Sequence, residues 1–145
     1  MLNRVTGALG LALLLAACQS STQAVVAAAA PKPAEQPRTF ALFFRSDSAQ
    51  LSPEAMKLVK EAAIAAKTRG DAHILAVGHT DTIGAGTYNL ALSQRRATAV
   101  KQALVDEGVP AEAIEASGQG EESLFVVTRD NIREAQNRRV EVTVQ

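Results

Sequence analysis

An acidic and a basic side chain are predicted to meet beyond the end of one strand. Asp81 follows the continuous apolar run Ile74–Val77, whose carboxyl end is the usual place for a ligand crevice in open α/β sheets. Arg96 lies on the next predicted helix, where the apolar stripe of Val100 and Leu104 ends. A guanidinium that loses part of its water there needs a carboxylate or a ligand anion. The spacing leaves two alternatives, an Asp81–Arg96 salt bridge that closes the loop onto the helix, or a site for a charged ligand.

Apolar patterns predict the elements that must position this pair. Strands are expected at four places, Phe40–Phe44, Ile74–Val77, Ile114–Gly118 and the alternating segment Val140–Val144. Helices are expected from Ser52, which precedes Pro53, to Gly70, and from Asn89 to Asp106 before Gly108 and Pro110. This order predicts an α/β sandwich in which two main helices pack on one face of a four-stranded mixed sheet, as β-α-β-α-β-β.

The start of the chain has the features of an export signal. Arg4 precedes the apolar stretch Gly7–Leu15, which is about half as long as the roughly 20 residues that a spanning helix needs. The next residues, Leu15-Ala16-Ala17-Cys18, resemble a bacterial lipobox. The resemblance implies a signal peptide at residues 1–17, acylation of Cys18 and cleavage before it. Gln19 then favours sorting to the outer membrane; the alternative is an ordinary signal peptide that contains a cysteine.

Composition limits what the rest of the chain can do. Residues 18–38, rich in Ala, Ser and Pro, are predicted to be a linker, and residues 39–145 a single domain. The 145 residues carry 15 Lys plus Arg and 15 Asp plus Glu, so no broad basic field is available for nucleic acid. Aromatic residues are 3% with no Trp, which also excludes a stacking platform for single strands.

Several motifs of this domain follow one another at the spacing of a known family. In chain order they are Gly78-His79-Thr80-Asp81, Tyr88-Asn89, Leu92-Ser93, Arg96-Ala97, Val100, Leu104 and Asn137-Arg138-Arg139-Val140-Glu141. The region 39–145 resembles the OmpA-like domain, a peptidoglycan-binding module. With the lipobox and linker, the chain is most similar to the peptidoglycan-associated lipoprotein group. This implies an outer-membrane lipoprotein whose domain faces the periplasm, binds peptidoglycan non-covalently and tethers the membrane to the cell wall.

The resemblance also implies roles for individual residues. Asp81 matches the aspartate that takes the ammonium of diaminopimelate in a stem peptide, and Arg96 the arginine that holds its carboxylate. The remaining predicted pocket residues are Asn89, Thr80, Asp47 and Arg138. Arg138 could equally serve packing, and Asp47 a turn before the first helix. No cofactor or metal is implied.

Two positions in the first pocket loop depart from the family pattern. Arg45 stands where the family often has an acidic residue, and Ser46 where it often has an aromatic one. This edge of the pocket is therefore expected to be smaller and more basic. The stretch 122–134 also lacks a proline that is common after the motif Gly118–Glu121.

Two other functions are alternatives to peptidoglycan binding. An enzyme is disfavoured because His73 and His79 are the only histidines, no nucleophile elbow is present, and three converging metal ligands are missing from the sequence. His79 is predicted to support the loop at the strand end. The second alternative is an adaptor that binds other envelope proteins and keeps only a vestigial pocket.

Overall fold

The computed structural model describes residues 36–145. The predicted signal peptide, the lipidation site Cys18 and nearly all of the predicted linker lie outside these residues. None of the helices in the described part is long and apolar enough to cross a membrane.

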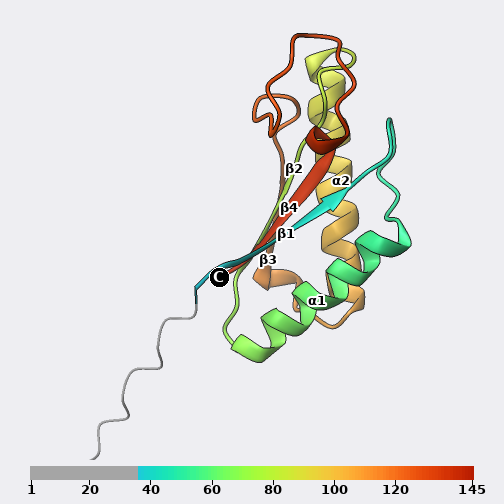
Figure 1. Cartoon of the computed structure of the whole chain (residues 1–145). Helices are drawn as coiled ribbons and strands as arrows, with labels where there is room; N and C mark the ends of the chain where they lie inside the picture. The colour runs from blue at the N-terminus through green and yellow to red at the C-terminus, as the bar shows by residue number, and fades with distance from the viewer. Residues whose placement is uncertain (1–35) are drawn as a thin grey trace, which may run out of the picture. The chain divides into compact units, whose positions relative to one another are not determined.

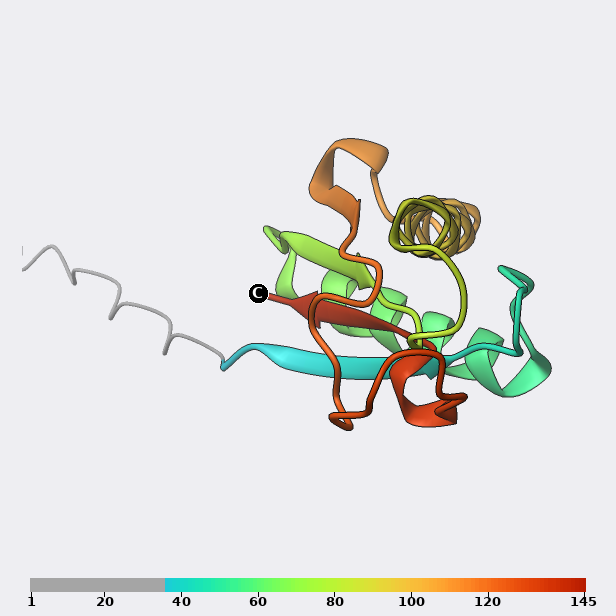
Figure 2. The same cartoon turned by 90° about the horizontal axis from the view of Figure 1, so that it is seen from above.

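A four-stranded mixed sheet is covered by two helices on the same side (Figures 1 and 2). The main elements are β1 (Arg38–Phe43), α1 (Pro53–Arg69), β2 (Ile74–Gly78), α2 (Gly86–Asp106), β3 (Ile114–Gly118) and β4 (Arg139–Val144). Two short 3-10 helices, Ala111–Ala113 and Ala135–Asn137, precede β3 and β4. The strand order is β1-β4-β2-β3. β2 and β3 are parallel, whereas β4 runs antiparallel to both β1 and β2. The predicted fold class and element order are confirmed.

The first helix forms where the sequence predicts it. The Ser52 hydroxyl accepts a hydrogen bond from the Ala55 N–H at 3.1 Å, and Pro53 occupies the first turn, where its missing N–H is harmless. Gly70 ends the helix with a φ of 83°, a conformation that glycine adopts without steric cost. The buried side of α1 is made of small residues: Ala55, Val59, Ala62, Ala63, Ala65 and Ala66.

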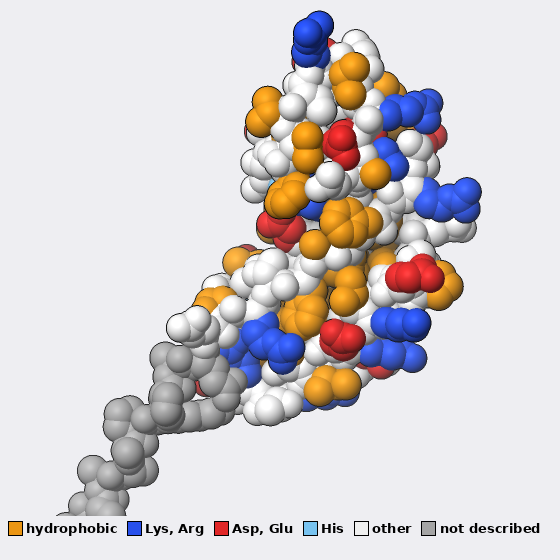
Figure 3. Space-filling view, viewed as in Figure 1, with side chains coloured by type: hydrophobic (Ala, Val, Ile, Leu, Met, Phe, Trp, Pro, Cys, Tyr) orange, Lys and Arg blue, Asp and Glu red, His pale blue; other side chains and the backbone are white. Residues whose placement is uncertain are grey.

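The core lies between the helices and one face of the sheet. Alternate residues of the central strand β4 are fully or almost fully buried, and Val142 lies opposite Phe40 of β1 and Ala76 of β2. The other sheet face is only partly covered, and Phe43 there is 49% exposed. In Figure 3 hydrophobic side chains form a band along the middle of the viewed surface, with charged side chains scattered around them.

The second helix begins at Gly86, three residues before the predicted start at Asn89. No side chain caps this end, so the sequence offers no local signal for it. α2 lies close to the sheet because two strands end in glycine. A Cβ atom added at Gly118 would lie 2.5 Å from the backbone nitrogen of Gln94, and one at Gly78 would lie 2.9 Å from the Ser93 carbonyl carbon. Only glycine permits this approach.

Candidate functional site

A cavity of about 280 Å³ opens beyond the carboxyl end of β2, beside the first turns of α2. Its wall comes from three regions that are distant in sequence: the loop after β1, the loop after β2 together with the α2 helix that follows it, and the loop before β4. The lining residues are Ser46, Asp47, Asp81, Ile83, Gly84, Tyr88, Asn89, Leu92, Arg96, Arg133 and Arg138. Five of the six pocket residues predicted from the sequence are therefore brought together, and Thr80 is not among them.

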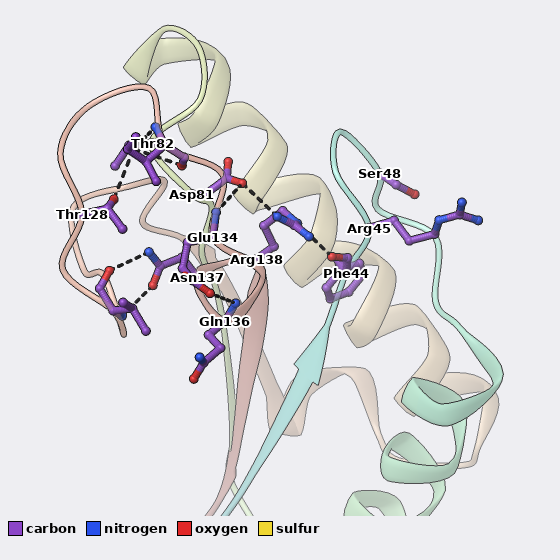
Figure 4. A network of polar contacts seen from close by, with 12 residues as sticks. Phe44, Arg45, Ser48, Asp81, Thr82, Thr128, Glu134, Gln136, Asn137 and Arg138 are labelled. Atoms are coloured by element: carbon purple, nitrogen blue, oxygen red, sulfur yellow. Dashed lines mark hydrogen bonds and ion pairs between the residues drawn. The ribbon is translucent and has the colours of Figure 1, made fainter.

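The carboxylate of Asp81 pairs with Arg138, not with Arg96. Asp81 Oδ2 lies 3.1 Å from Arg138 Nη1, and the two side chains are only 8% and 16% exposed (Figure 4). The same oxygen accepts from the Glu134 N–H at 3.4 Å, and Arg138 Nε donates to the Phe44 carbonyl at 3.2 Å. Asp81 Oδ1 has no hydrogen-bond partner within residues 36–145. The carboxylate is thus held through one oxygen, and the other oxygen makes no hydrogen bond to the described residues.

Arg96 is fully buried and is satisfied by backbone carbonyls. Its Nε donates to Ser48 O at 2.8 Å, Nη1 to His79 O at 2.8 Å, and Nη2 to Arg45 O at 3.0 Å. Burial lowers the pKa of the guanidinium to about 10, against the opposing effect of Asp81. The predicted alternative of a plain Asp81–Arg96 salt bridge is wrong, because Asp81 pairs with Arg138 and the Arg96 guanidinium donates to backbone carbonyls. Three of its five N–H groups are used, which leaves one on each terminal nitrogen.

Asn89 is also buried and joins the helix to two loops. Its Nδ2 donates to Glu121 Oε2 at 2.6 Å and to the Asp81 carbonyl at 3.4 Å. A short bond to a carboxylate is the stronger kind. Asn89 therefore fixes the backbone of Asp81 next to the cavity.

Asp47 forms the opposite rim. It has a φ of 51°, which Asp tolerates in tight turns, and its Oδ1 accepts a hydrogen bond from the Tyr88 hydroxyl. This hydrogen bond raises the pKa of the Tyr88 hydroxyl. The Arg95 guanidinium lies 5.6 Å from the centre of the Tyr88 ring. The hydrogen bond between Asp47 and Tyr88 ties the loop after β1 to α2 at the cavity.

Thr80 and His79 lie beneath the site and do not line it. Both side chains are buried, and Thr80 Oγ1 and His79 Nδ1 have no partner within the described residues. The prediction that Thr80 lines the pocket is therefore wrong; its backbone N–H donates to the Gly120 carbonyl at 2.8 Å. His79 supports the loop through its carbonyl, which accepts from Arg96. Burial, followed by the charge of Arg139, lowers the pKa of the His79 imidazole.

The loop before β4 is held in place by side-chain contacts that the sequence did not predict. Thr82 Oγ1 donates to the Arg129 carbonyl at 2.7 Å and accepts from the Ile132 N–H at 3.0 Å. The Asn137 side chain pairs with both backbone groups of Val126 at 2.8 Å (Figure 4). This loop supplies Arg133 and Arg138 to the cavity. No group of three or more His, Cys, Asp or Glu side chains that could hold a metal ion occurs in residues 36–145.

Comparison with known proteins gives the family. The model of the OmpA family matches residues 43–138. This chain belongs to the OmpA family. It is 42% identical over 119 residues to an outer membrane protein of Gluconacetobacter diazotrophicus, covering 78% of this chain and 31% of that protein. It is 41% identical over 100 residues to the peptidoglycan-associated lipoprotein of Pseudomonas putida, covering 69% of this chain and 60% of that protein. The chain thus spans less than two thirds of either relative.

A solved structure supports the same assignment. The peptidoglycan-associated lipoprotein from Burkholderia pseudomallei is 36% identical, with a TM-score of 0.67, over 72% of this chain and 89% of that one. The periplasmic domain of Helicobacter pylori MotB shares the fold at a TM-score of 0.62 with 20% identity. The predicted family resemblance is confirmed.

Two charged residues at the site of this OmpA-family domain are not predicted from the sequence. Glu121 belongs to the motif Gly118–Glu121. Nothing in the local sequence indicates that its carboxylate accepts a hydrogen bond from Asn89. Arg133 lies in a stretch without strand or helix periodicity, so the sequence did not indicate that it faces the cavity.

Proposed function

We propose that this protein is an outer-membrane lipoprotein whose domain binds peptidoglycan non-covalently through the diaminopimelate of its stem peptides. The single observation that supports this most directly is one cavity lined by both Asp81 and Arg96. Acyl chains on Cys18 hold the other end in the outer membrane, and the chain tethers that membrane to the cell wall.

The chemistry of the ligand matches the groups that the cavity leaves unused. The side chain of meso-diaminopimelate ends in an ammonium and a carboxylate on the same carbon. Asp81 Oδ1 accepts from the ammonium while Arg138 stays on Oδ2. The two remaining N–H groups of Arg96 donate to the carboxylate, in the forked geometry that favours arginine.

The names of the relatives agree with this proposal. The Pseudomonas putida and Burkholderia pseudomallei proteins are both called peptidoglycan-associated lipoproteins. The lipobox-like segment before Cys18 supports the same kind of membrane anchor here.

Sedimentation with purified cell-wall sacculi tests the binding. The wild-type protein is expected to sediment with diaminopimelate-type sacculi, and Asp81→Asn to weaken binding by roughly 10- to 150-fold, since a charge-assisted hydrogen bond contributes about 1.5–3 kcal/mol. Asp71→Asn, an exposed residue outside the cavity, is the matched control and should bind normally. Wild-type protein that stays in the supernatant would contradict the proposal and favour the adaptor alternative.

Cys18→Ser tests the anchor separately. Because it removes the sulfur that is acylated, the variant should remain an uncleaved precursor in the inner membrane. Membrane fractionation with size analysis measures this. A processed, outer-membrane form of the variant would refute lipidation at Cys18.

A further inference from the structure

We propose that Arg133 binds a second carboxylate of the stem peptide, so that the domain prefers stems in which this carboxylate is free over stems in which it is amidated. The inference rests on the proposed peptidoglycan site and adds a specificity-determining residue to it. Arg133 comes from the loop before β4 and lines the same cavity as Asp81 and Arg96.

Arg133 is the cavity arginine whose guanidinium is uncommitted. Arg96 donates to three carbonyl groups, and Arg138 donates to Asp81 and to the Phe44 carbonyl. The Arg133 guanidinium makes no hydrogen bond or ion pair within residues 36–145, although its side chain lies at the cavity. All of its donors are therefore available to a ligand.

The backbone on both sides of Arg133 is fixed to the floor of the site. The Ile132 N–H donates to Thr82 Oγ1 at 3.0 Å, and the Glu134 N–H to Asp81 Oδ2 at 3.4 Å. The loop after β2, which carries the proposed ammonium acceptor Asp81, thus also sets the position of Arg133. These two hydrogen bonds fix the backbone from which the Arg133 side chain extends, so only the outer part of the side chain has to move to contact a ligand.

The charge of the cavity favours an additional anion. Three guanidiniums and two carboxylates line it, an excess of one positive charge. The zwitterionic end of diaminopimelate is neutral and leaves that excess unchanged. A stem has two further carboxylates near this residue, the α-carboxylate of the preceding γ-linked D-glutamate and the carboxylate of a terminal D-alanine. Arginine suits either, because its fork matches a carboxylate.

Calorimetry with purified full-length protein in detergent tests the inference. The probes are a free diaminopimelate tetrapeptide, the same peptide with D-isoglutamine, and the same peptide with a C-terminal amide. Wild-type protein should bind the free peptide about fivefold more tightly than one amidated form, as expected for a solvent-accessible ion pair of ~1 kcal/mol. The form that loses affinity identifies the carboxylate that Arg133 contacts.

Two arginine variants complete the test. Arg133→Gln should abolish the preference and bind the discriminated amidated peptide as wild type does, which also shows that it is folded. Arg45→Gln removes the same charge from an exposed side chain that does not line the cavity, and should keep the preference. Equal wild-type affinities for all three peptides, or a preference that persists in Arg133→Gln, would overturn the role of Arg133 alone. Absence of wild-type binding to every peptide would overturn the proposed function as well.

Discussion

The two helices cover the same face of the sheet but bury different chemistry. The buried side of α1 consists of alanines and one valine, whereas the first half of α2 buries Asn89, Ser93 and Arg96. Burying a polar group is costly unless it is hydrogen-bonded. Each of these three has partners: Ser93 Oγ, for example, donates to the Leu90 carbonyl and accepts from the Gly120 N–H. The buried side of α1 serves the core alone, whereas Asn89 and Arg96 of α2 also line the cavity.

Arg96→Ala should give the largest difference between the helices. It leaves three carbonyl groups without their donor and opens a void, so we expect a loss of about 3–5 kcal/mol in the free energy of unfolding. Val59→Ala in α1 removes two carbon atoms from the core and should cost about 2 kcal/mol. Urea unfolding measures both. A smaller loss for Arg96→Ala than for Val59→Ala would show that the carbonyl contacts do not stabilise the fold.

A smaller effect, on the pH dependence of the free energy of unfolding, should distinguish the two ends of β2. His79 is buried at the end beneath α2, and its pKa is lowered below the ordinary value of 6.5, mainly by burial. A histidine with a lowered folded-state pKa stays neutral while the unfolded chain takes up a proton. Stability is therefore unaffected above about pH 6.5 and falls as the pH decreases below it.

Paired histidine variants check this dependence. His79→Gln should remove the acid-side fall in the free energy of unfolding between pH 7 and pH 5. His73→Gln, at the exposed start of β2 where the imidazole lies 3.2 Å from Glu115, should keep it. The assignment to His79 fails if both variants retain the wild-type pH profile.

The same contrast explains what could be predicted from the sequence. The N-cap Ser52, the glycine at position 70 and the alternation in β4 are local signals, and the elements they indicate are present. The pairing of Asp81 with Arg138 joins residues 57 positions apart through a loop without periodicity, so helix spacing pointed to Arg96 instead. The partners of Arg96 are backbone carbonyls, which no side-chain pattern reveals.

Thr80 and Arg133 are two residues whose side-chain positions could not be predicted from the sequence. Alternation along a strand fails where the strand ends, so the side to which Thr80 points could not be inferred. Arg133 reaches the cavity only because neighbouring backbone groups bond to Thr82 and Asp81. Loop positions of this kind depend on tertiary contacts more than on local propensity.

Calorimetry with two stem peptides, one containing meso-diaminopimelate and one containing lysine, tests the central claim most directly. Lysine lacks the terminal carboxylate, so its binding would leave the two free N–H groups of buried Arg96 without an acceptor, and sites built around a polar group reject such analogues. The diaminopimelate peptide should bind at least about tenfold more tightly, a difference of roughly 1.4 kcal/mol. Equal affinities for the two peptides would contradict the account, because the cavity would then not recognise the carboxylate that Arg96 is proposed to hold.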